Sequence, residues 1–179
     1  EMNEKMFERK AGVDVTTKNS TERAAAVATE GMNSEFYRCK IVSSQDTLYT
    51  GSTGYFKECE IYGNTDYIFG GNSVAFDNCD LVWYGYSDVE SGGHIAASKT
   101  SSVTDPGYFF NNCTIKKNSM PGMKFAKGDF GRNWGGANSA MFFNNTTLDG
   151  VEKPGSWATM GGELSLSRVF INYVHNAGE

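Results

Sequence analysis

The sequence predicts an all-β fold, a parallel β-helix of about six to seven turns. A six-residue pattern recurs about every 20 residues, which is the period of a stacked repeat. Helical signals are weak, since the only Ala-rich stretch, Arg23 to Thr29, is short, while Gly is frequent at 21 residues. The period also leaves no room for a crossover helix, which excludes a βαβ arrangement.

The repeated pattern is an aromatic residue, two mostly polar residues, a small residue, a polar residue and an aliphatic one. The small and aliphatic positions lie two apart, so both side chains point to one face of a strand. This recurring inward face favours a β-helix over an antiparallel sandwich. An earlier copy is expected at Val13–Val15 and a degenerate late copy at Phe170–Tyr173. The clear copies are Phe36–Ile41, Phe56–Ile61, Phe76–Leu81, Phe110–Ile115 and Phe143–Leu148.

Two intervals between copies exceed the basic period and predict loops. Insertions in a solenoid emerge as loops, often on its binding face. We expect the first loop at Tyr84–Gly93 and the second at Met120–Gly131.

Composition narrows the class of protein. The 179 residues suit one β-helix domain, 1–179, which we expect to be a fragment of a larger protein or to have further domains as partners. The net charge of −5 and the lack of a basic stripe argue against nucleic acid as a partner. No apolar run is long enough for a membrane span, and no secretory signal is visible in this sequence.

The cysteines and histidines give weaker signals. The four cysteines lack a C-x-x-C pair, which disfavours a structural zinc site. Cys39, Cys59 and Cys79 follow the period, and we expect a buried ladder of small side chains, with a disulfide between stacked neighbours as the alternative. His94 and His175 are expected in a loop or on the surface rather than as catalytic bases.

Asp46 and Asp66 are also separated by one period. In a β-helix this separation would stack them about 4.8 Å apart, one strand spacing. Two carboxylates so close do not readily ionise together, so one tends to keep a proton while the other is charged. The pair therefore predicts a general acid beside a nucleophile. The alternative is that each aspartate only forms a turn.

Five segments, in order over roughly residues 11 to 178, resemble motifs of the pectin methylesterase family. They correspond to Q-D-T-L-Y, to D-F-I-F-G with Tyr67 for the first Phe, to L-G-R-P-W with Asn133 for Pro, to the G-W-x-x-M segment of bacterial members with Ser156 inserted, and to F-x-E-Y-x-N-x-G. The segments are Gln45–Tyr49, Asp66–Gly70, Phe130–Trp134, Gly155–Met160 and Phe170–Gly178.

The resemblance implies a right-handed parallel β-helix that hydrolyses methyl esters of homogalacturonan (pectin) outside the cell. By motif, Asp66 would be the nucleophile and Asp46 the general acid and then base. Gln45 would help to hold the oxyanion, and Arg132 would pair with Asp66. The sugar groove would be lined by Tyr49, Phe69, Trp134, Met160 and Trp157, although Trp157 would equally serve as a cap on the core.

The chemistry of these residue types agrees with the implied roles. A guanidinium favours the ionised state that a carboxylate nucleophile needs. A neutral carboxyl group can protonate the departing methoxide and later take a proton from water. An amide side chain can donate to the oxyanion. The scheme requires no metal ion and no organic cofactor.

The sequence departs from the family pattern at two places. Ala25 stands where the family has a second glutamine, in Q-A-V-A-L, and the period places it directly beneath Gln45. Losing one oxyanion donor costs roughly a hundred- to a thousandfold in turnover, which puts activity in doubt. Family members also have several more turns before this region. The chain is therefore expected to be an excised piece, a shortened member with its own cap, or one partner of an assembly.

Three alternatives to an active esterase follow. The same groove could bind pectin without turnover, as the loss at Ala25 suggests. The chain could be a structural β-solenoid piece of a larger surface protein. A polysaccharide lyase ranks lowest, because such enzymes typically use a calcium cluster of several acidic residues, and no such cluster follows from the period here.

Overall fold

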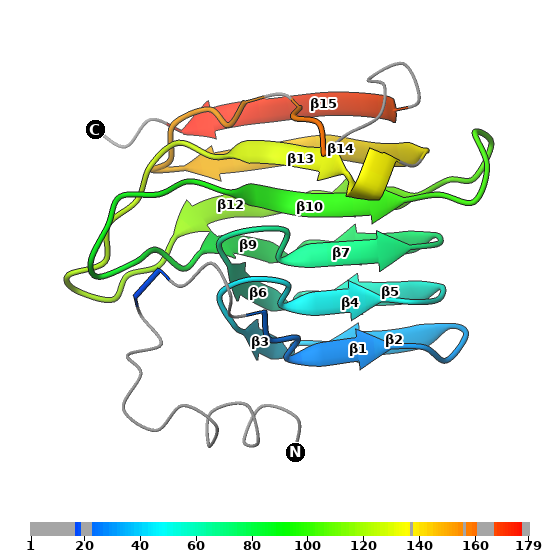
Figure 1. Cartoon of the computed structure of the whole chain (residues 1–179), viewed down its shortest axis with the longest axis horizontal. Coiled ribbons are helices and arrows are strands. Elements are labelled where there is room, and N and C mark those ends of the chain that lie inside the picture. Colours follow the sequence, from blue (N-terminus) through cyan, green and yellow to red (C-terminus); the bar gives the residue numbers. More distant parts are fainter. Residues whose placement is uncertain (1–16, 19–22, 137, 156, 161–166, 177–179) are drawn as a thin grey trace.

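The computed structural model describes residues 17–18, 23–136, 138–155, 157–160 and 167–176. Short strands dominate it, with one short 3₁₀ helix, η1 (Trp134–Gly136), and no α-helix in these ranges (Figure 1). The strands are β1 (Val27–Thr29), β2 (Ser34–Tyr37), β3 (Lys40–Val42), β4 (Leu48–Thr50), β5 (Gly54–Lys57), β6 (Glu60–Gly63), β7 (Ile68–Gly71), β8 (Val74–Asp77), β9 (Asp80–Trp83), β10 (His94–Lys99), β11 (Tyr108–Asn111), β12 (Thr114–Lys117), β13 (Asp129–Asn133), β14 (Ser139–Asp149) and β15 (Ser167–Asn176).

The strands stack into a parallel β-helix, which confirms the predicted fold class. One sheet has the order β1-β4-β7-β10-β13 (Figure 1). Each strand in it therefore lies beside the strand that comes three places later in the chain. The other sheet runs β2-β5-β8-β11-β14-β12-β9-β6-β3, where the long β14 joins two stacks and also pairs with β15. All pairings between these strands are parallel. The described residues thus form five successive coils and part of a sixth.

The repeated hexamer builds the interior of the coils. Its aromatic residues stack face to face, with ring centroids 4.7 Å apart for Phe36 and Phe56, 5.1 Å for Phe56 and Phe76, and 4.3 Å for Phe110 and Phe143. Aligned flat rings bury apolar area at every step of the stack. The late copy lies in β15, but Ile171 rather than Phe170 is the register partner of Phe143, and Val13–Val15 is outside the described residues.

Four of the hexamers have a cysteine at the small position, the fifth has Thr146, and all four cysteines are free. Cys59, Cys79 and Cys113 are fully buried, while Cys39 in the first coil is partly exposed. This confirms the predicted ladder of small side chains and disfavours the disulfide.

The residue before each small position turns the coil. It adopts a left-handed backbone in every copy, with φ between 51° and 53°. Asparagine tolerates this region better than most residues, which explains its frequency here. The side chains also stack, as Asn145 Nδ2 donates to Asn112 Oδ1 at 2.7 Å. The turning residues are Arg38, Glu58, Asn78, Asn112 and Asn145.

Two long loops leave the same side of the β-helix (Figure 1). The first, Tyr84–Gly93, is confirmed as a loop between β9 and β10. The second was predicted to extend through Gly131, but Asp129–Gly131 already belong to β13, because these residues pair with β10. The loops contact each other through two backbone hydrogen bonds between Tyr86 and Lys124, of 3.1 and 2.7 Å.

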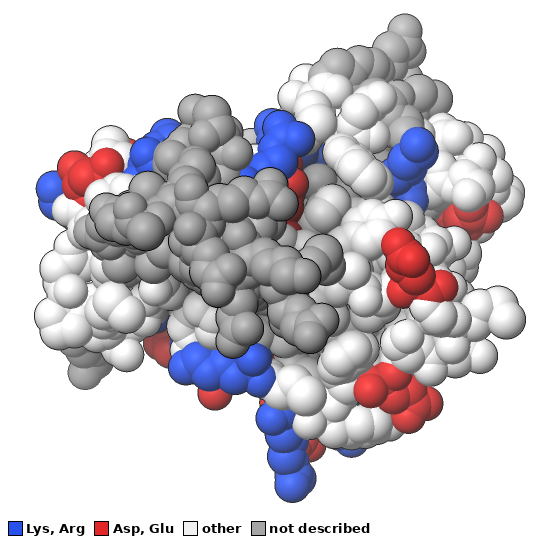
Figure 2. All heavy atoms as spheres, turned by 60° about the horizontal axis from the view of Figure 1, so that its bottom comes forward, with Lys and Arg blue, Asp and Glu red and all other residues white. Residues whose placement is uncertain are grey.

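The outer surface carries charges of both signs. On the face shown in Figure 2, acidic and basic side chains are scattered among uncharged ones, and the described residues form no basic surface that extends across it. The described residues also include no helix with the length and apolar character of a membrane span.

Candidate active site

Asp46 and Asp66 occupy equivalent corners of successive coils. Each turns the chain just before a strand of the first sheet, β4 or β7, with a left-handed backbone of φ 58° and 49°. A parallel bridge joins Gln45 to Thr65, and the Asp46 N–H donates to the Thr65 carbonyl at 3.1 Å. Aspartate is one of the few residues that tolerates this conformation, so a turn-forming role and a chemical role coincide here.

Arg132 holds Asp66 through a two-pronged contact. Its Nε donates to Asp66 Oδ1 at 2.9 Å and its second guanidinium nitrogen to Oδ2 at 2.5 Å. Arg132 in β13 and Phe69 in β7 are both register partners of Ala97 in β10. The two residues therefore lie on the same face of the sheet, two coils apart. The Asp66 side chain is only 7% exposed, and both its oxygens accept from a cation. Such a contact requires the carboxylate form of Asp66.

Asp46 lies in a different electrostatic environment. Burial, followed by the charge of Asp66, raises the pKa of Asp46 to about 6, against opposing effects of Arg23, Arg132 and Gln45. Its side chain is 17% exposed, and its only ion pair among the described residues is a 3.9 Å contact with Arg23 Nε. Asp46 is therefore the member of the pair that keeps a proton in mildly acidic solution.

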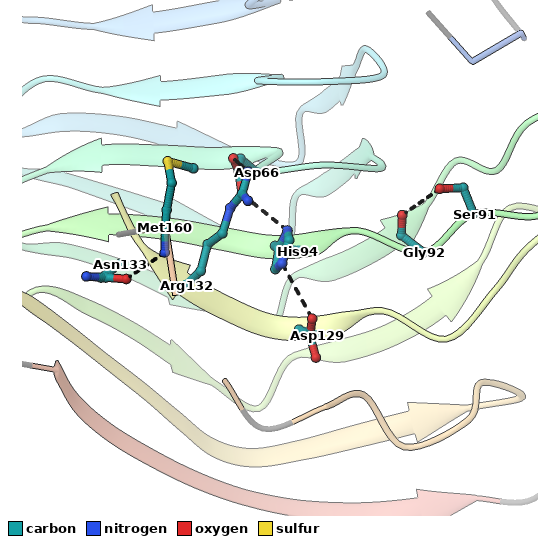
Figure 3. A network of polar contacts seen from close by, with 8 residues as sticks. All are labelled: Asp66, Ser91, Gly92, His94, Asp129, Arg132, Asn133 and Met160. Carbon is teal, nitrogen blue, oxygen red and sulfur yellow. Dashed lines mark hydrogen bonds and ion pairs between the residues drawn. The ribbon is translucent and has the colours of Figure 1, made fainter. Parts of the chain in front are cut away.

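One pocket collects most of the residues predicted for the site. Tyr49, which was also predicted, packs beside it, with its ring centroid 5.2 Å from that of Phe69 and 6.4 Å from that of Trp134. Met160 is fixed by a hydrogen bond of its N–H to Asn133 Oδ1, at 3.1 Å (Figure 3). The pocket is lined by Arg23, Gln45, Asp46, Asp66, Phe69, Arg132, Trp134 and Met160.

Trp157 does not join this group. It is absent from the lining of the pocket and packs against the hydrophobic core, as the capping alternative expected. Its indole N–H is buried without an acceptor among the described residues. A role of Trp157 in sugar binding stays a prediction.

The expected position of Ala25 is wrong by one residue. The first coil is one residue longer than the period, since Val27 pairs with Leu48, and the Ala24 N–H is the one that donates to the Gln45 carbonyl, at 3.2 Å. Ala25 does not line the pocket. Arg23, which the sequence analysis did not single out, extends a 72% exposed side chain to the mouth of the pocket instead.

His94 was predicted to be a loop or surface residue, and the structure contradicts this. It begins β10, and its side chain is 16% exposed. Figure 3 shows its ring between Asp66 and Asp129, with Nδ1 3.6 Å from Asp66 Oδ1 and Nε2 3.4 Å from Asp129 Oδ2. The position of His94 could not be predicted from the period, because the long first loop interrupts the period just before this residue. Its register partner, Asp129, lies three residues before Arg132, which the sequence did assign to the site.

The site shows no arrangement for a metal ion. Within the described ranges, no three His, Cys, Asp or Glu side chains are grouped so that they could hold one.

Fold and site together define a class of protein: a parallel β-helix with an aspartate pair and an arginine in a surface pocket bordered by aromatic rings. The chain belongs to the pectinesterase family, whose family model, described as Pectinesterase, matches residues 2–179. A search of curated protein sequences finds no match.

Solved structures agree with this assignment. The pectin methylesterase from Aspergillus niger is 30% identical, with a TM-score of 0.70 over 89% of this chain and 52% of that chain. The enzyme from Yersinia enterocolitica is 26% identical, with a TM-score of 0.66 over 97% of this chain and 62% of that one. A pectin methylesterase in complex with hexasaccharide VII, at 22% identity and a TM-score of 0.64, shares the fold over 97% of this chain and 58% of that chain. This chain thus spans between half and two thirds of these structures.

Proposed function

We propose that this protein hydrolyses the methyl esters of homogalacturonan (pectin), giving pectate and methanol, with Asp66 as the nucleophile. The observation that carries the proposal is the pairing of two equivalent aspartates with unequal surroundings. Asp66 is bound by Arg132 as a carboxylate, whereas the pKa of Asp46 is raised to about 6. Ester hydrolysis through a covalent intermediate needs one ionised and one protonated carboxyl group at the same bond.

In the first half of the reaction, Asp66 attacks the carbonyl carbon of the methyl ester. The negative charge that develops on the carbonyl oxygen is stabilised by the amide of Gln45, which lines the pocket beside Asp46. Asp46 gives its proton to the methoxide as the C–O bond breaks, and methanol leaves. The product of this step is an anhydride between Asp66 and the galacturonate.

In the second half, Asp46 is ionised and acts as a base. It removes a proton from a water molecule, whose oxygen attacks the galacturonate carbonyl carbon and releases Asp66 as a carboxylate. The carboxyl product remains on the polymer, and Asp46 is again protonated. The same group serves both steps because its raised pKa lies close to mildly acidic working conditions.

The sugar chain would lie along the aromatic border of the pocket. Tyr49, Phe69 and Trp134 form one cluster, with the Phe69 and Trp134 rings 5.6 Å apart and perpendicular. Flat apolar faces suit the C–H faces of sugar rings. We place Met160 beside them, with Trp157 as a further predicted contact, and propose that the protein acts outside the cell on plant cell-wall pectin.

The direct test is methanol release from highly methylated pectin. We expect turnover by the wild-type chain and none above background for Asp66→Ala and Asp46→Ala. Asp149→Ala changes an exposed aspartate at the end of β14, outside the pocket, and should retain wild-type activity. Equal rates for the wild type and the two pocket variants would refute the proposed function.

The second candidate is a binding module that holds pectin without hydrolysing it. It is favoured by the composition of the pocket, where Gln45 is the one amide side chain among the lining residues. This candidate predicts saturable binding of pectin, weakened by Trp134→Ala, together with no methanol release. An Ala24→Gln variant that gained activity would indicate an esterase weakened by loss of its second amide, because Ala24 is the residue that hydrogen-bonds to the Gln45 backbone.

A further inference from the structure

A polar network continues from the pocket into the side of the β-helix. It runs from Arg132 to Asp66, then to His94 and on to Asp129 (Figure 3). His94 and Asp129 are the first residues of β10 and β13, and they are register partners in adjacent coils. The catalytic steps proposed above use neither residue.

The backbone on either side of this network is tightly held. Gly93 approaches the coil below so closely that a Cβ atom there would lie 1.8 Å from the Asn64 carbonyl oxygen. Its own carbonyl accepts from the Asp129 N–H in the coil above, at 2.8 Å. The main chain leading into His94 is therefore fixed from both sides, and the position of the imidazole ring follows from the stacking of the coils.

Both ring nitrogens of His94 face a carboxylate, but a neutral imidazole carries one N–H. Burial and then the charge of Arg132 lower the pKa of His94, against the opposing charges of Asp66 and Asp129. The neutral ring consequently dominates near neutral pH, and it can donate to Asp66 or to Asp129 but not to both.

The surroundings of the two carboxylates decide between these forms. Nδ1 is buried and makes no hydrogen bond among the described residues, and the carboxylate oxygen that it faces, Asp66 Oδ1, is 3.6 Å away. Asp66 is 7% exposed and cannot rely on water, whereas Asp129 is 35% exposed and is partly solvated. A proton on Nδ1 therefore satisfies the more buried group, and the lone pair on Nε2 faces the carboxylate that water can reach.

We propose that His94 is a positioning residue for the Asp66 nucleophile, donating from Nδ1 to Oδ1 while Asp129 faces its other nitrogen. Oδ1 then accepts from both Arg132 and His94, which leaves Oδ2 with one donor and makes Oδ2 the attacking oxygen. Protonation of the ring in acid adds a second cation beside Asp66 and lowers its nucleophilicity. The charged and titratable groups facing His94 are Asp66, Asp129 and Arg132, with Asp46 on the far side of Asp66. This inference rests on the proposed function.

Nitrogen NMR of the two histidines tests the contact without any need for activity. A His175→Gln variant identifies the signals of His94. We expect the Nδ1–H form near neutral pH, and a lower pKa of His94 in Asp66→Asn and in Asp129→Asn, because each substitution removes a negative charge that favours the imidazolium. An Nε2–H form, or a titration of His94 that Asp66→Asn leaves unchanged, would overturn the inference.

Kinetics then test the positioning role. His94→Ala should lower kcat by about ten- to a hundredfold with little change in KM, as expected when a reacting group loses its orientation. It should also remove the ionisation of His94 from the acid limb of the pH profile. His94→Gln, whose amide can donate to Asp66 but does not titrate, should recover part of kcat without restoring that ionisation. Wild-type kcat and pH profile in a folded His94→Ala protein would contradict the proposal.

The two proposals can fail separately. If the wild type releases no methanol, the esterase function is rejected, and the NMR result alone decides whether His94 donates to Asp66. If methanol is released but Asp66→Asn leaves the titration of His94 unchanged, the esterase stands and the positioning role is rejected.

Discussion

Asp46 and Asp66 occupy the same corner of successive coils, with φ of 58° and 49°, and yet their surroundings differ. Asp66 is bound by both prongs of Arg132 and faced by His94. Among the described residues, Asp46 makes one ion pair, a 3.9 Å contact with an arginine whose side chain is 72% exposed. The backbone repeat makes the two positions equivalent, and the neighbouring side chains make them chemically different.

This difference shows how a solenoid can make an acid and a nucleophile from one repeated residue. The cation that binds the second aspartate, Arg132, comes from β13, and β10 lies between this strand and β7 in the sheet.

 The chain completes the coils that begin with β7 and β10 before it reaches β13, but the stacking of the coils brings Arg132 directly to Asp66. The charge of Asp66 then contributes to the raised pKa of Asp46. Four predictions test this difference between the surroundings of Asp46 and Asp66, from the largest expected effect to the smallest.

Removing the carboxylate of Asp66 should have the largest effect. Asp66→Asn deletes the nucleophile and should lower methanol release by roughly 10⁴-fold or more. Asp46→Asn deletes only the acid and base and should cost roughly 10²- to 10⁴-fold. The measurement is kcat for both variants on methylated pectin. A larger loss for Asp46→Asn than for Asp66→Asn would reverse the roles assigned to the two residues.

Arg132→Lys should have the next largest effect. Lysine keeps the positive charge but cannot bind both oxygens of Asp66 in a fixed geometry. We expect kcat to fall by about a hundredfold, as for a misplaced reacting group. Steady-state kinetics with far-UV circular dichroism as a folding control would measure this. Arg38→Lys, which changes an exposed arginine paired with Glu58 outside the pocket, is the matched control and should retain activity.

Asp46→Asn should stabilise the fold near neutral pH. The pKa of Asp46 is raised from 3.8 to about 6, so the native state binds more protons than the unfolded state between these values. The stability contributed by this group therefore falls as the pH rises through this window, by up to about 3 kcal/mol. Asparagine removes the penalty and also tolerates the left-handed corner.

Urea unfolding at about pH 4 and about pH 8 measures this effect. Asp46→Asn should unfold at higher urea than the wild type at the higher pH and at nearly the same urea at the lower pH. An equal gain at both values would show that the gain does not come from the ionisation of Asp46.

Arg23→Gln should have the smallest effect. Its ion pair with Asp46 is long and its side chain is largely exposed, so it contributes at most about 1 kcal/mol. Loss of this cation should raise the pKa of Asp46 and move the basic limb of the activity profile upward. The shift should weaken in high salt. A downward shift would mean that Arg23 does not act on Asp46 through its charge.

Much of the fold could be predicted because the repeat is regular. Phe56 and Phe76, or Cys59 and Cys79, stack as their spacing indicated, and so do Asp46 and Asp66. Arg132 was assigned to Asp66 only through the family resemblance, because its distance along the chain carries no information about register once a loop intervenes.

The misses all fall where the regular spacing ends. Ala25 lies at the start of the first coil, which is one residue longer than the period, and His94 follows the long first loop.

The sequence by itself determined the β-helix, its aromatic stack, its cysteine ladder and the vertical pairing of the two aspartates. Only the tertiary structure decided that the cysteines are free, that Arg132 binds both oxygens of Asp66, that His94 lies between Asp66 and Asp129, and that Arg23 rather than Ala25 reaches the pocket. The physical reason is that backbone hydrogen bonds between coils set the register. A constant period reveals that register in the sequence, whereas an inserted loop or an extra residue conceals it until the coils are stacked.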